Sequence, residues 1–527
     1  MLDAVTHTPQ HQPHEIFESG HFSASLCSVV GEPDHSYASR DGIHVWVDGE
    51  IYSVGQDQEI ENPKEDTAEL LLDLYRADRE WLWLPAVNGL FCFALYDENT
   101  GRLYLATDRY GLQHLFYSQN ETSIVWTSEV KAYARVPDVP KTKNTEAIDH
   151  FIENGQFPEN ETWFRELKLL GPGRMLEIEL STLKIKDKQY WSWADIPQEP
   201  DTNGLAEKIE SAFIRSVDRR CRGSKSIGLG LSGGLDSRLI LAALSELNKA
   251  SDSVAVTFGV TGSEEIRIAQ KCAEIDNTHH HVEEINDDAW LERREEAVWW
   301  TDGQTSIQHL HIADVSEPIN SLYKVHLCGY LGDVVLGGTY FARGDEKATM
   351  NERGRRFIIQ GTRCIRAFAY PRCVFFDNDI IELVYSRPER IRKLHRLYAK
   401  VVSLKFKPFF GPIEWAGTGH TLIPWWKYYG RVRCSGLVRR LRRLVGVKNK
   451  KYQSAIPYSQ WLGKKPSLNR LRDTLTTHPQ LFREADRVRT ITHMVDQYNS
   501  DSDFSNKLLA HYTAEVFWRR LSESTAD

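Results

Sequence analysis

The string GLGLSGGLDS at residues 228–237 constrains the fold of this chain more than any other stretch. It begins with small and apolar residues, which is typical of a buried strand, and then turns through two glycines. The apolar run LILAAL at residues 239–244 follows and predicts a helix. A strand, a glycine-rich turn and a helix N-terminus together form an anion site, because backbone N–H groups and the helix dipole face the anion. We therefore predict that this stretch binds a polyphosphate.

The polar side chains of this loop indicate how the phosphates are held. The hydroxyls of Ser232 and Ser237 add hydrogen-bond donors. The carboxylate of Asp236 belongs beside a polyphosphate only if a divalent cation bridges the two. An ordinary turn between strand and helix is the alternative, but the pattern SGGxDS is far more specific than a pair of glycines. The loop lacks the GK[ST] of a P-loop and resembles the pyrophosphate loop of the ATP pyrophosphatases.

Composition excludes several classes of protein. A chain of 527 residues with 41% hydrophobic and 26% charged residues is typical of a globular protein of two to four domains. A net charge of −8 argues against a nucleic-acid partner, and no apolar run reaches the roughly 20 residues that span a membrane. The N-terminus has no signal-peptide core, and the eight cysteines are scattered without a CxxC pair. We expect a cytoplasmic protein with reduced thiols, and the oligomeric state stays open.

The first part of the chain predicts a β-rich domain over residues 1–190. Short alternating apolar segments are separated by turn residues, and one helical stretch at residues 67–74 interrupts them. This pattern favours an α+β layered β-sandwich. A proline-rich, acidic stretch at residues 195–202 is the expected linker to a second domain.

Four motifs in this part resemble the glutaminase domain of the asparagine synthetase family. They are VDGEIY at 47–52, GLFCFALYD at 89–97, TDRYG at 107–111 and TSEVK at 127–131. The resemblance implies an Ntn-hydrolase-like fold.

The glutaminase residues themselves are missing. The family uses a cysteine directly after the initiator methionine, and this chain has Leu2 there. By alignment, three further glutamine-binding positions fall at Ser25, Asp48 and near Thr67. Cys27 lies within a predicted strand and lacks the terminal amine that would activate a thiolate. We expect a degenerate domain with a structural or docking role, and an undetected internal glutaminase is the alternative.

Residues 203–527 predict an α/β domain. A strand at 254–258, a helix at 263–275 and a strand at 278–282 follow the central loop, which is the order of a doubly wound parallel sheet. The chain resembles the synthetase domain of the same family, an ATP pyrophosphatase, and a helix at 508–521 is expected in a helical C-terminal extension.

A second glycine-rich loop, HLCGYLGD at residues 326–333, resembles the family's second acidic loop. Asp333 then matches a second magnesium carboxylate. Tyr330 stands where asparagine synthetases carry a glutamate and β-lactam synthetases a tyrosine, and base and pocket wall are both open roles for it. Arg372 matches the arginine of a further family motif. At the position where that motif has an acid, this chain has Tyr370.

The resemblance therefore implies a set of site residues for ATP and Mg²⁺. Asp236 and Asp333 would hold the metal, and the catalytic candidates are Asp236, Asp333, Tyr330 and Arg372. The nucleotide-binding candidates are Leu231, Ser232, Gly233, Gly234, Asp236, Ser237, Phe258, Gly259 and Gly329.

Beyond residue 390, one feature departs from the family's pattern and a second has no counterpart in the motifs given above. The family places a lysine against the departing pyrophosphate, but residues 415–419 hold none, which leaves Lys405 and Lys407 as candidates. Residues 427–451 are strongly basic, and either an acidic peptide or carrier binds there or the segment is a solvated helix face.

These features predict ATP-dependent amide-bond formation through an acyl-adenylate, with release of AMP and pyrophosphate and without glutamine hydrolysis. The expected partner is a carboxylate-bearing small molecule or precursor peptide, with a companion peptide-processing protein as a further candidate. Intramolecular closure, as in the lasso peptide cyclases that the chain resembles, is the favoured form. An ammonia-using asparagine synthetase and a non-catalytic binding homologue are the alternatives.

Overall fold

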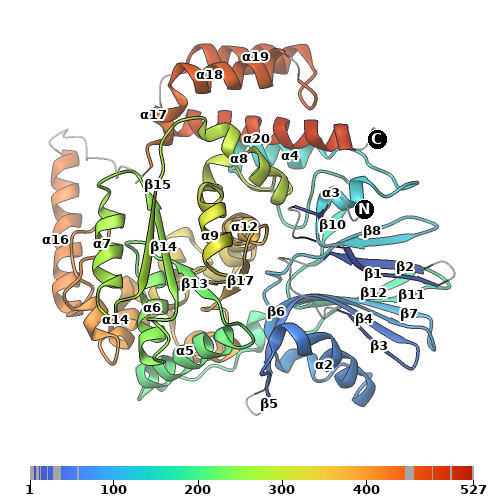
Figure 1. The fold of residues 1–527 in the computed structure, drawn as a ribbon, viewed down its shortest axis with the longest axis horizontal. Helices are drawn as coiled ribbons and strands as arrows, with labels where there is room; N and C mark the ends of the chain where they lie inside the picture. Colours follow the sequence, from blue (N-terminus) through green and yellow to red (C-terminus); the bar gives the residue numbers. More distant parts are fainter. Residues whose placement is uncertain are drawn as a thin grey trace.

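The chain folds into an N-terminal part built around two sheets and a C-terminal part built around a third (Figure 1). The computed structural model describes residues 5–7, 11, 13–19, 22–27, 37–55, 58–444, 456–477, 479–498 and 501–524. The layered β-rich domain and the parallel-sheet domain expected from the sequence are both present.

In the N-terminal part, a seven-stranded antiparallel sheet faces a three-stranded sheet and a two-stranded hairpin. The strand order in the large sheet is β12-β11-β7-β6-β4-β3, with β5 paired to β4. The strands are β1 (Pro13–Ser19), β2 (Phe22–Cys27), β3 (Tyr37–Arg40), β4 (Ile43–Val54), β5 (Gln58–Glu59), β6 (Val87–Asp97), β7 (Arg102–Thr107), β8 (Phe116–Gln119), β9 (Ile124–Thr127), β10 (Lys168–Leu169), β11 (Arg174–Glu179) and β12 (Lys184–Gln189). The helices are α2 (Pro63–Ala77), α3 (Val130–Ala134) and α4 (Thr145–Asn154).

Two glycines fix the pairing of the central strands β4 and β6. A Cβ atom at Gly49 would lie 2.2 Å from the carbonyl oxygen of Leu90, and one at Gly89 would lie 2.4 Å from that of Glu50. Only glycine leaves room for this approach, and Gly49 also has a φ of +119°, which side chains disfavour. These glycines hold Asp48 and Glu50 at a fixed register at the domain boundary.

The C-terminal part contains a five-stranded parallel sheet in the order β15-β14-β13-β16-β17, with helices on both faces (Figure 1). Its first elements are α5 (Leu205–Cys221), β13 (Ile227–Gly230), α6 (Asp236–Glu246), β14 (Val254–Gly259), α7 (Glu264–Ala273), β15 (His279–Glu284), α8 (Trp290–Trp300), α9 (Ser316–Leu322), β16 (Val325–Cys328) and α10 (Gly332–Gly337). Then come α11 (Glu346–Thr349), a π-helix (Met350–Ile358), α12 (Ile359–Ile365), β17 (Tyr370–Cys373), α13 (Asn378–Tyr385), α14 (Arg396–Val402) and α15 (Lys407–Phe410).

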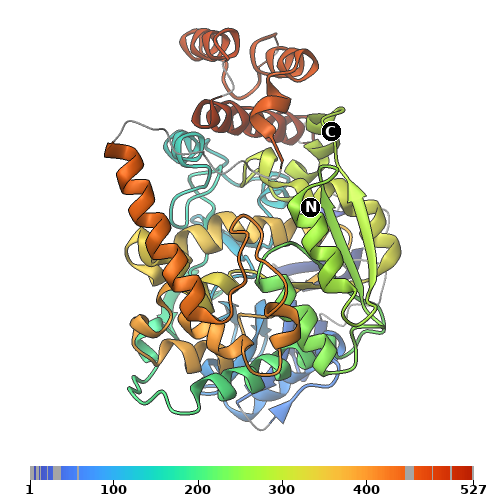
Figure 2. The same cartoon turned by 90° about the vertical axis from the view of Figure 1, so that its left-hand side faces the viewer.

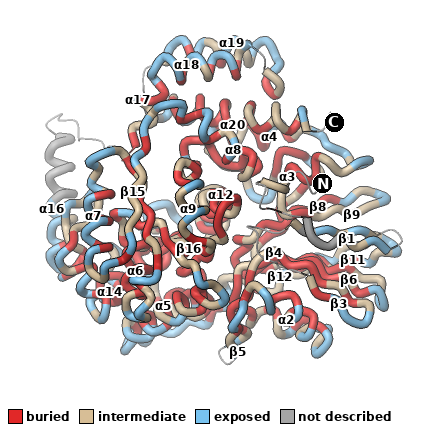
Figure 3. The backbone as a smooth tube through the Cα atoms, in the orientation of Figure 1, coloured by how far each residue is buried: buried red, intermediate tan, exposed pale blue. Residues whose placement is uncertain are grey.

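A helical extension completes this part. It consists of α16 (Trp425–Leu444), α17 (Tyr458–Leu462), α18 (Lys465–Arg472), α19 (Ala485–Asp496) and α20 (Ser502–Ser524). Figure 2 shows α16 on the outside of the parallel-sheet domain, and Figure 3 shows α18 and α19 exposed above the more buried α20. The basic segment 427–451 lies partly outside the described residues, since 445–455 are not described. Across the described part of the chain, we find no helix long and apolar enough to cross a bilayer.

Buried ion pairs join the two parts. Glu50 and Arg372, each 1% exposed, form a bidentate pair with distances of 2.6 and 2.7 Å. Asp48 accepts two hydrogen bonds from Arg366, and Lys131 pairs with Asp302 at 3.1 Å. Breaking one partner of such a pair leaves a buried charge, which costs about 3–5 kcal/mol. The N-terminal part is therefore firmly attached to the part that carries the loops.

Candidate functional site

The two loops singled out in the sequence leave neighbouring strands. Strands β13 and β16 are parallel and in register, with Leu229 opposite Leu327. The carboxyl ends of parallel strands meet at one edge of a sheet, and ligands of open α/β sheets bind there. The loops that follow these two strands therefore start side by side.

A direct hydrogen bond joins the loops. The backbone N–H of Asp333 donates to Oδ2 of Asp236 at 2.9 Å. A Cβ atom at Gly332 would lie 2.6 Å from Cγ of Asp236, and one at Gly329 would lie 3.0 Å from its Cβ. The second loop needs glycine at both positions, because any side chain would push it away from Asp236. The structure thus brings the backbone of Asp333 into contact with the carboxylate of Asp236.

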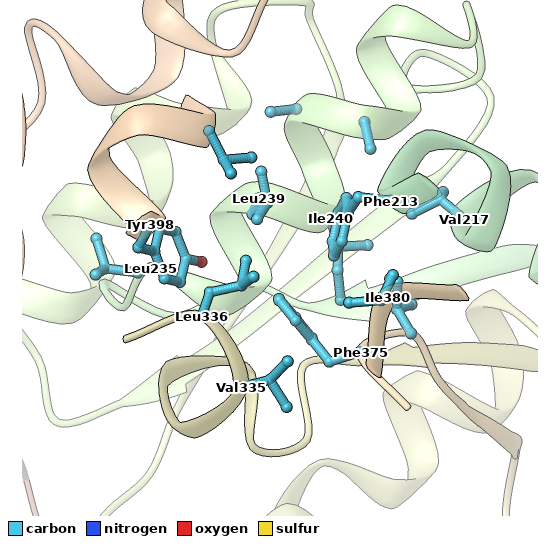
Figure 4. Packing of buried hydrophobic residues seen from close by; sticks show 14 of the residues in the cluster. Phe213, Val217, Leu235, Leu239, Ile240, Val335, Leu336, Phe375, Ile380 and Tyr398 are labelled. Carbon is cyan, nitrogen blue, oxygen red and sulfur yellow. The ribbon is translucent and has the colours of Figure 1, made fainter. Parts of the chain in front are cut away.

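The apolar core beneath the loops fixes their positions (Figure 4). Leu235 and Leu239, from the start of α6, belong to one buried cluster with Leu336 of α10. Phe375, which follows β17, completes this core. Both acidic loops therefore rest on one packed body, and the relative position of Asp236 and Asp333 follows from that packing.

Tyr398 is a site residue that the sequence analysis missed. Its hydroxyl donates to Oδ1 of Asp236 at 3.1 Å, and its ring is fully buried. Tyr398 comes from α14, beyond residue 390, where the resemblance to the family's motifs weakens. A tyrosine in an apolar helical segment carries no local signal for such a contact. Only the fold brings it to the end of β13.

The electrostatics of this pair fit a divalent cation. Burial, followed by the neighbouring Asp333 carboxylate, raises the pKa of Asp236 well above its usual range. Burial also raises the pKa of Asp333. A cation between them would relieve both effects. Mg²⁺ is often bound by one or two carboxylates together with substrate phosphates, and among the described residues no group of three His, Cys, Asp or Glu forms a closed metal cage.

The first loop is held in shape by its own hydroxyls. The N–H of Ser232 donates to Oγ of Ser237 at 3.0 Å, and the N–H of Gly234 donates to Oγ of Ser232 at 3.2 Å. The two serine hydroxyls lie 3.1 Å apart. These bonds fold the loop around the start of α6, where a phosphate cradle is predicted, and Gly233 is closely covered, since a Cβ there would lie 2.6 Å from Cβ of Ala416.

Arg238 holds the segment around Ala416, which covers Gly233, in place. Its buried guanidinium donates to the carbonyl oxygens of Gly233, at 3.2 Å, and of Glu414, at 2.9 Å. It thereby ties residues 413–417 to the phosphate loop. This segment is the place expected for a pyrophosphate lysine, and it carries none. Of the two alternatives, Lys407 starts the short helix α15, and the backbone N–H of Lys405 bonds Glu210.

The candidates for the nucleoside lie along the same edge. Leu231 is buried, and its N–H donates to the carbonyl of Val256 at 2.8 Å. Phe258 at the end of β14 is half-buried, and its ring centroid lies 5.4 Å from that of His311. Gly259 follows it, and a Cβ atom at this position would be crowded, since it would lie 3.0 Å from Oγ of Ser263. These residues line the edge next to Ser232, as the parallel order requires.

The base role considered for Tyr330 is not supported. The residue is 4% exposed, and its hydroxyl is buried without a hydrogen-bond partner in the described chain. Burial raises its pKa well above 10. The ring packs on Phe376, with centroids 5.2 Å apart. These contacts favour the wall role of the two that were left open, because a base needs a nearby proton acceptor or cation and an accessible pKa.

The catalytic role expected of Arg372 is corrected by its contacts. Its three guanidinium nitrogens are all occupied by Glu50 and by the carbonyl oxygens of Arg220 and Arg222. It points into the boundary between the two parts of the chain and away from the Asp236 loop. The motif survives there because it pairs with Glu50 of the N-terminal VDGEIY string.

Asp48 lies at the same boundary, whereas Glu129 of the TSEVK motif and Cys27 make contacts within the N-terminal part. Asp48, at the position of a family asparagine, binds Arg366 with a shortest distance of 2.6 Å. Glu129 pairs with His7 at 2.9 Å and with Lys131 at 2.5 Å. The thiol of Cys27 lies 3.8 Å from the carbonyl oxygen of Val5. Leu2 lies outside the described residues.

Comparison with known proteins identifies two matching regions. A family model described as a glutamine amidotransferase domain matches residues 37–191, and one described as asparagine synthase matches residues 208–407. The glutamine-hydrolyzing asparagine synthetase 2 of Bacillus subtilis is 24% identical over 365 residues, which cover 64% of this chain and 49% of that protein. A putative glutamine-hydrolyzing asparagine synthetase 2 of Methanocaldococcus jannaschii is 24% identical over 335 residues, covering 62% and 64%.

The chain thus spans about half to two thirds of the length of these curated relatives. A solved structure of glutamine phosphoribosylpyrophosphate amidotransferase from B. subtilis with ADP and GMP matches 47% of this chain and 62% of that chain, at 11% identity and a TM-score of 0.20.

Proposed function

Because the chain belongs to the asparagine synthetase family, we propose that it is an ATP-dependent amide ligase. It activates a carboxylate as an acyl-adenylate, releases pyrophosphate and then joins the acyl group to an amine with release of AMP. It does so without hydrolysing glutamine.

The proposal rests on the chemistry that a carboxylate requires. A carboxylate does not react with an amine in water, because oxide would have to leave. Adenylation replaces oxide by AMP as the leaving group. A fixed set of donors beside the phosphates lowers the barrier to that step, because the site does not have to reorganise as charge moves.

One observation carries the proposal: the N–H of Asp333 lies 2.9 Å from Oδ2 of Asp236, beside the serine-lined turn. These two carboxylates would hold Mg²⁺, which supplies positive charge to the pyrophosphate leaving group. The hydroxyl of Tyr398 orients the Asp236 carboxylate, and the loop of Ser232 and Ser237 supplies phosphate donors.

The source of the amine follows from the lost glutaminase residues. Because Asp48, at the position of a family asparagine, is engaged by Arg366, we expect that ammonia from glutamine is not produced within the chain. The amine then belongs to the substrate itself, and the favoured reaction is closure of a peptide between an acidic side chain and an amine, as in the lasso-type cyclases. An amine held in place beside the adenylate attacks at high effective concentration.

Exchange of radiolabelled pyrophosphate into ATP tests this function. The assay is run with Mg²⁺ and a panel of acids: L-aspartate, N-acetyl-L-aspartate, N-acetyl-L-glutamate and short peptides with one free acidic side chain. Exchange with the peptides or blocked acids supports the proposal. Exchange with free aspartate alone points to an ammonia-using asparagine synthetase, and no exchange with any acid overturns the ligase in favour of a binding protein.

A further inference from the structure

A half-buried arginine stands beside the second loop without an acidic partner. Arg353 lies in the π-helix Met350–Ile358 and forms no ion pair with any carboxylate in the described chain. Its Cζ lies 4.4 Å from the ring centroid of Phe357. Its neighbours Arg355 and Arg356, by contrast, donate to oxygens of the N-terminal part, among them the carbonyls of Leu170 and Glu161.

The helix that carries Arg353 is pressed against the second loop. A Cβ atom at Gly354 would lie 3.1 Å from the hydroxyl oxygen of Tyr330 and 2.9 Å from Cδ1 of Leu331. Arg355 holds the other side of the helix, since its Nε donates to the carbonyl oxygen of Gly111 in the N-terminal part. Irregular π-helical turns occur frequently at functional sites. The degenerate domain thus fixes the position of Arg353.

Arg353 belongs to a row of side chains that follows the carboxyl edge of the sheet. Burial raises the pKa of the nearby Tyr340, the charge of Arg353 offsets part of that rise, and the charge of Asp333 adds to it. In the other direction, the ring of Phe357 lies 4.7 Å from that of His309. The row connects the acidic loop to the 3₁₀ turns at 307–315, where His311 reaches Phe258.

Adenylation brings two anions into contact, namely the substrate carboxylate and the α-phosphate. Mg²⁺ on Asp236 and Asp333 serves the pyrophosphate side of that contact. A second cation is needed on the carboxylate side, and guanidinium matches a carboxylate with two parallel hydrogen bonds. We propose that Arg353 binds the carboxylate of the acyl donor next to Asp333, with the ring of Phe357 packed against the guanidinium. This assignment rests on the ligase function proposed above.

The test separates the carboxylate from the nucleotide. In pyrophosphate exchange with the best acid of the panel, Arg353→Gln raises the KM for the acid by roughly 10- to 100-fold, the value of a hydrogen bond to a charged group. The KM values for ATP and pyrophosphate stay within about threefold. Arg353→Lys recovers part of the loss. A rise in the KM for ATP or pyrophosphate, with the acid unaffected, would assign Arg353 to the phosphates and overturn the proposal.

Arg343→Gln is the matched control. Arg343 lies over the same Tyr340 ring, with Cζ 5.8 Å from its centroid, but it is exposed. We expect its KM values within threefold of the original. An equal loss in both variants would indicate a general charge effect and contradict a specific subsite.

A binding arm keeps this inference distinct from the ligase proposal. N-acetyl-L-aspartate and a peptide with one free aspartate are titrated calorimetrically into the full chain and into Arg353→Gln without ATP. Weaker binding to the variant supports the subsite even if no exchange is found, and equal binding overturns it. Tighter binding of the peptide would indicate that the site takes the side chain of a peptide, and tighter binding of N-acetyl-L-aspartate would indicate a small acid.

Discussion

The backbone N–H of Asp333 donates to Oδ2 of Asp236 at 2.9 Å, and this bond makes one site of two loops almost a hundred residues apart. The contact depends on glycines 329 and 332, which leave space for the Asp236 side chain. It also depends on the register of β13 and β16. The site is therefore a property of the sheet and not of either loop alone.

Replacing Asp236 by Asn should abolish pyrophosphate exchange while the fold survives. The amide keeps the shape, and its oxygen can still accept from the N–H of Asp333 while its NH2 group donates to the hydroxyl of Tyr398, but it removes the charge that holds the metal. We expect a loss of at least about a hundredfold, since the metal contributes several kcal/mol. Circular dichroism and thermal unfolding check the fold. Exchange at the original rate would remove Asp236 from the site.

Tyr398→Phe tests the contact that the sequence did not show. Loss of a hydrogen bond to a charged group costs about 1.5–3 kcal/mol, so the apparent affinity for Mg²⁺ in the exchange assay should fall roughly tenfold or more. Tyr428→Phe is the control, because Tyr428 is also a buried tyrosine of this region and packs on Trp415, not on a carboxylate. If both variants need the same magnesium concentration as the original chain, Tyr398 does not orient Asp236.

Removing the Tyr330 hydroxyl distinguishes a wall from a base. Loss of a general base lowers turnover by about 10²–10⁴-fold. The hydroxyl is buried without a partner in the described chain, so Tyr330→Phe should keep the full amide-forming reaction within about threefold. Its melting temperature should be unchanged or higher, because an unsatisfied buried group costs about 1–3 kcal/mol. A hundredfold loss in amide formation with normal pyrophosphate exchange would show that Tyr330 acts as a base.

Arg372 and Glu50 form a pair that a double-mutant cycle can resolve. Arg372→Met alone leaves the Glu50 carboxylate buried and unpaired and should destabilise the chain by about 3–5 kcal/mol. Combining it with Glu50→Leu should recover most of that loss. A catalytic arginine would behave differently, since activity would stay lost in the stable double variant. Thermal unfolding and exchange rates, measured on all four chains, give the answer.

The sequence was enough to predict the β-rich domain, the parallel-sheet domain, the strand-turn-helix at residues 227–246 and the two glycine-rich loops, because each has local patterning or a motif. It was not enough to predict the role of Arg372, which matches a family motif but binds Glu50 of the other domain. It also gave no sign of Tyr398 or Arg238. Long-range packing decides those contacts, and a single residue in an apolar or helical stretch has no periodicity that reports its partner.

A buried neutral histidine should make the fold sensitive to acid. Burial lowers the pKa of His326 to about 4, and its Nδ1 lies 2.9 Å from the hydroxyl of Tyr323. The unfolded chain has an ordinary pKa near 6.5, so between these values it binds more protons than the folded chain. The stability from this group is complete above pH 6.5 and falls as the pH drops toward 4.

At pH 5 this one histidine should lower the free energy of unfolding by about 2 kcal/mol relative to pH 7.5. His326→Gln removes the titration, so its melting temperature should fall less between pH 7.5 and pH 5 than that of the original chain. His279→Gln is the matched control, because His279 is exposed on the neighbouring sheet edge. Equal pH dependence in the original chain and His326→Gln would mean that His326 does not stay neutral inside β16, and that other groups cause the acid sensitivity.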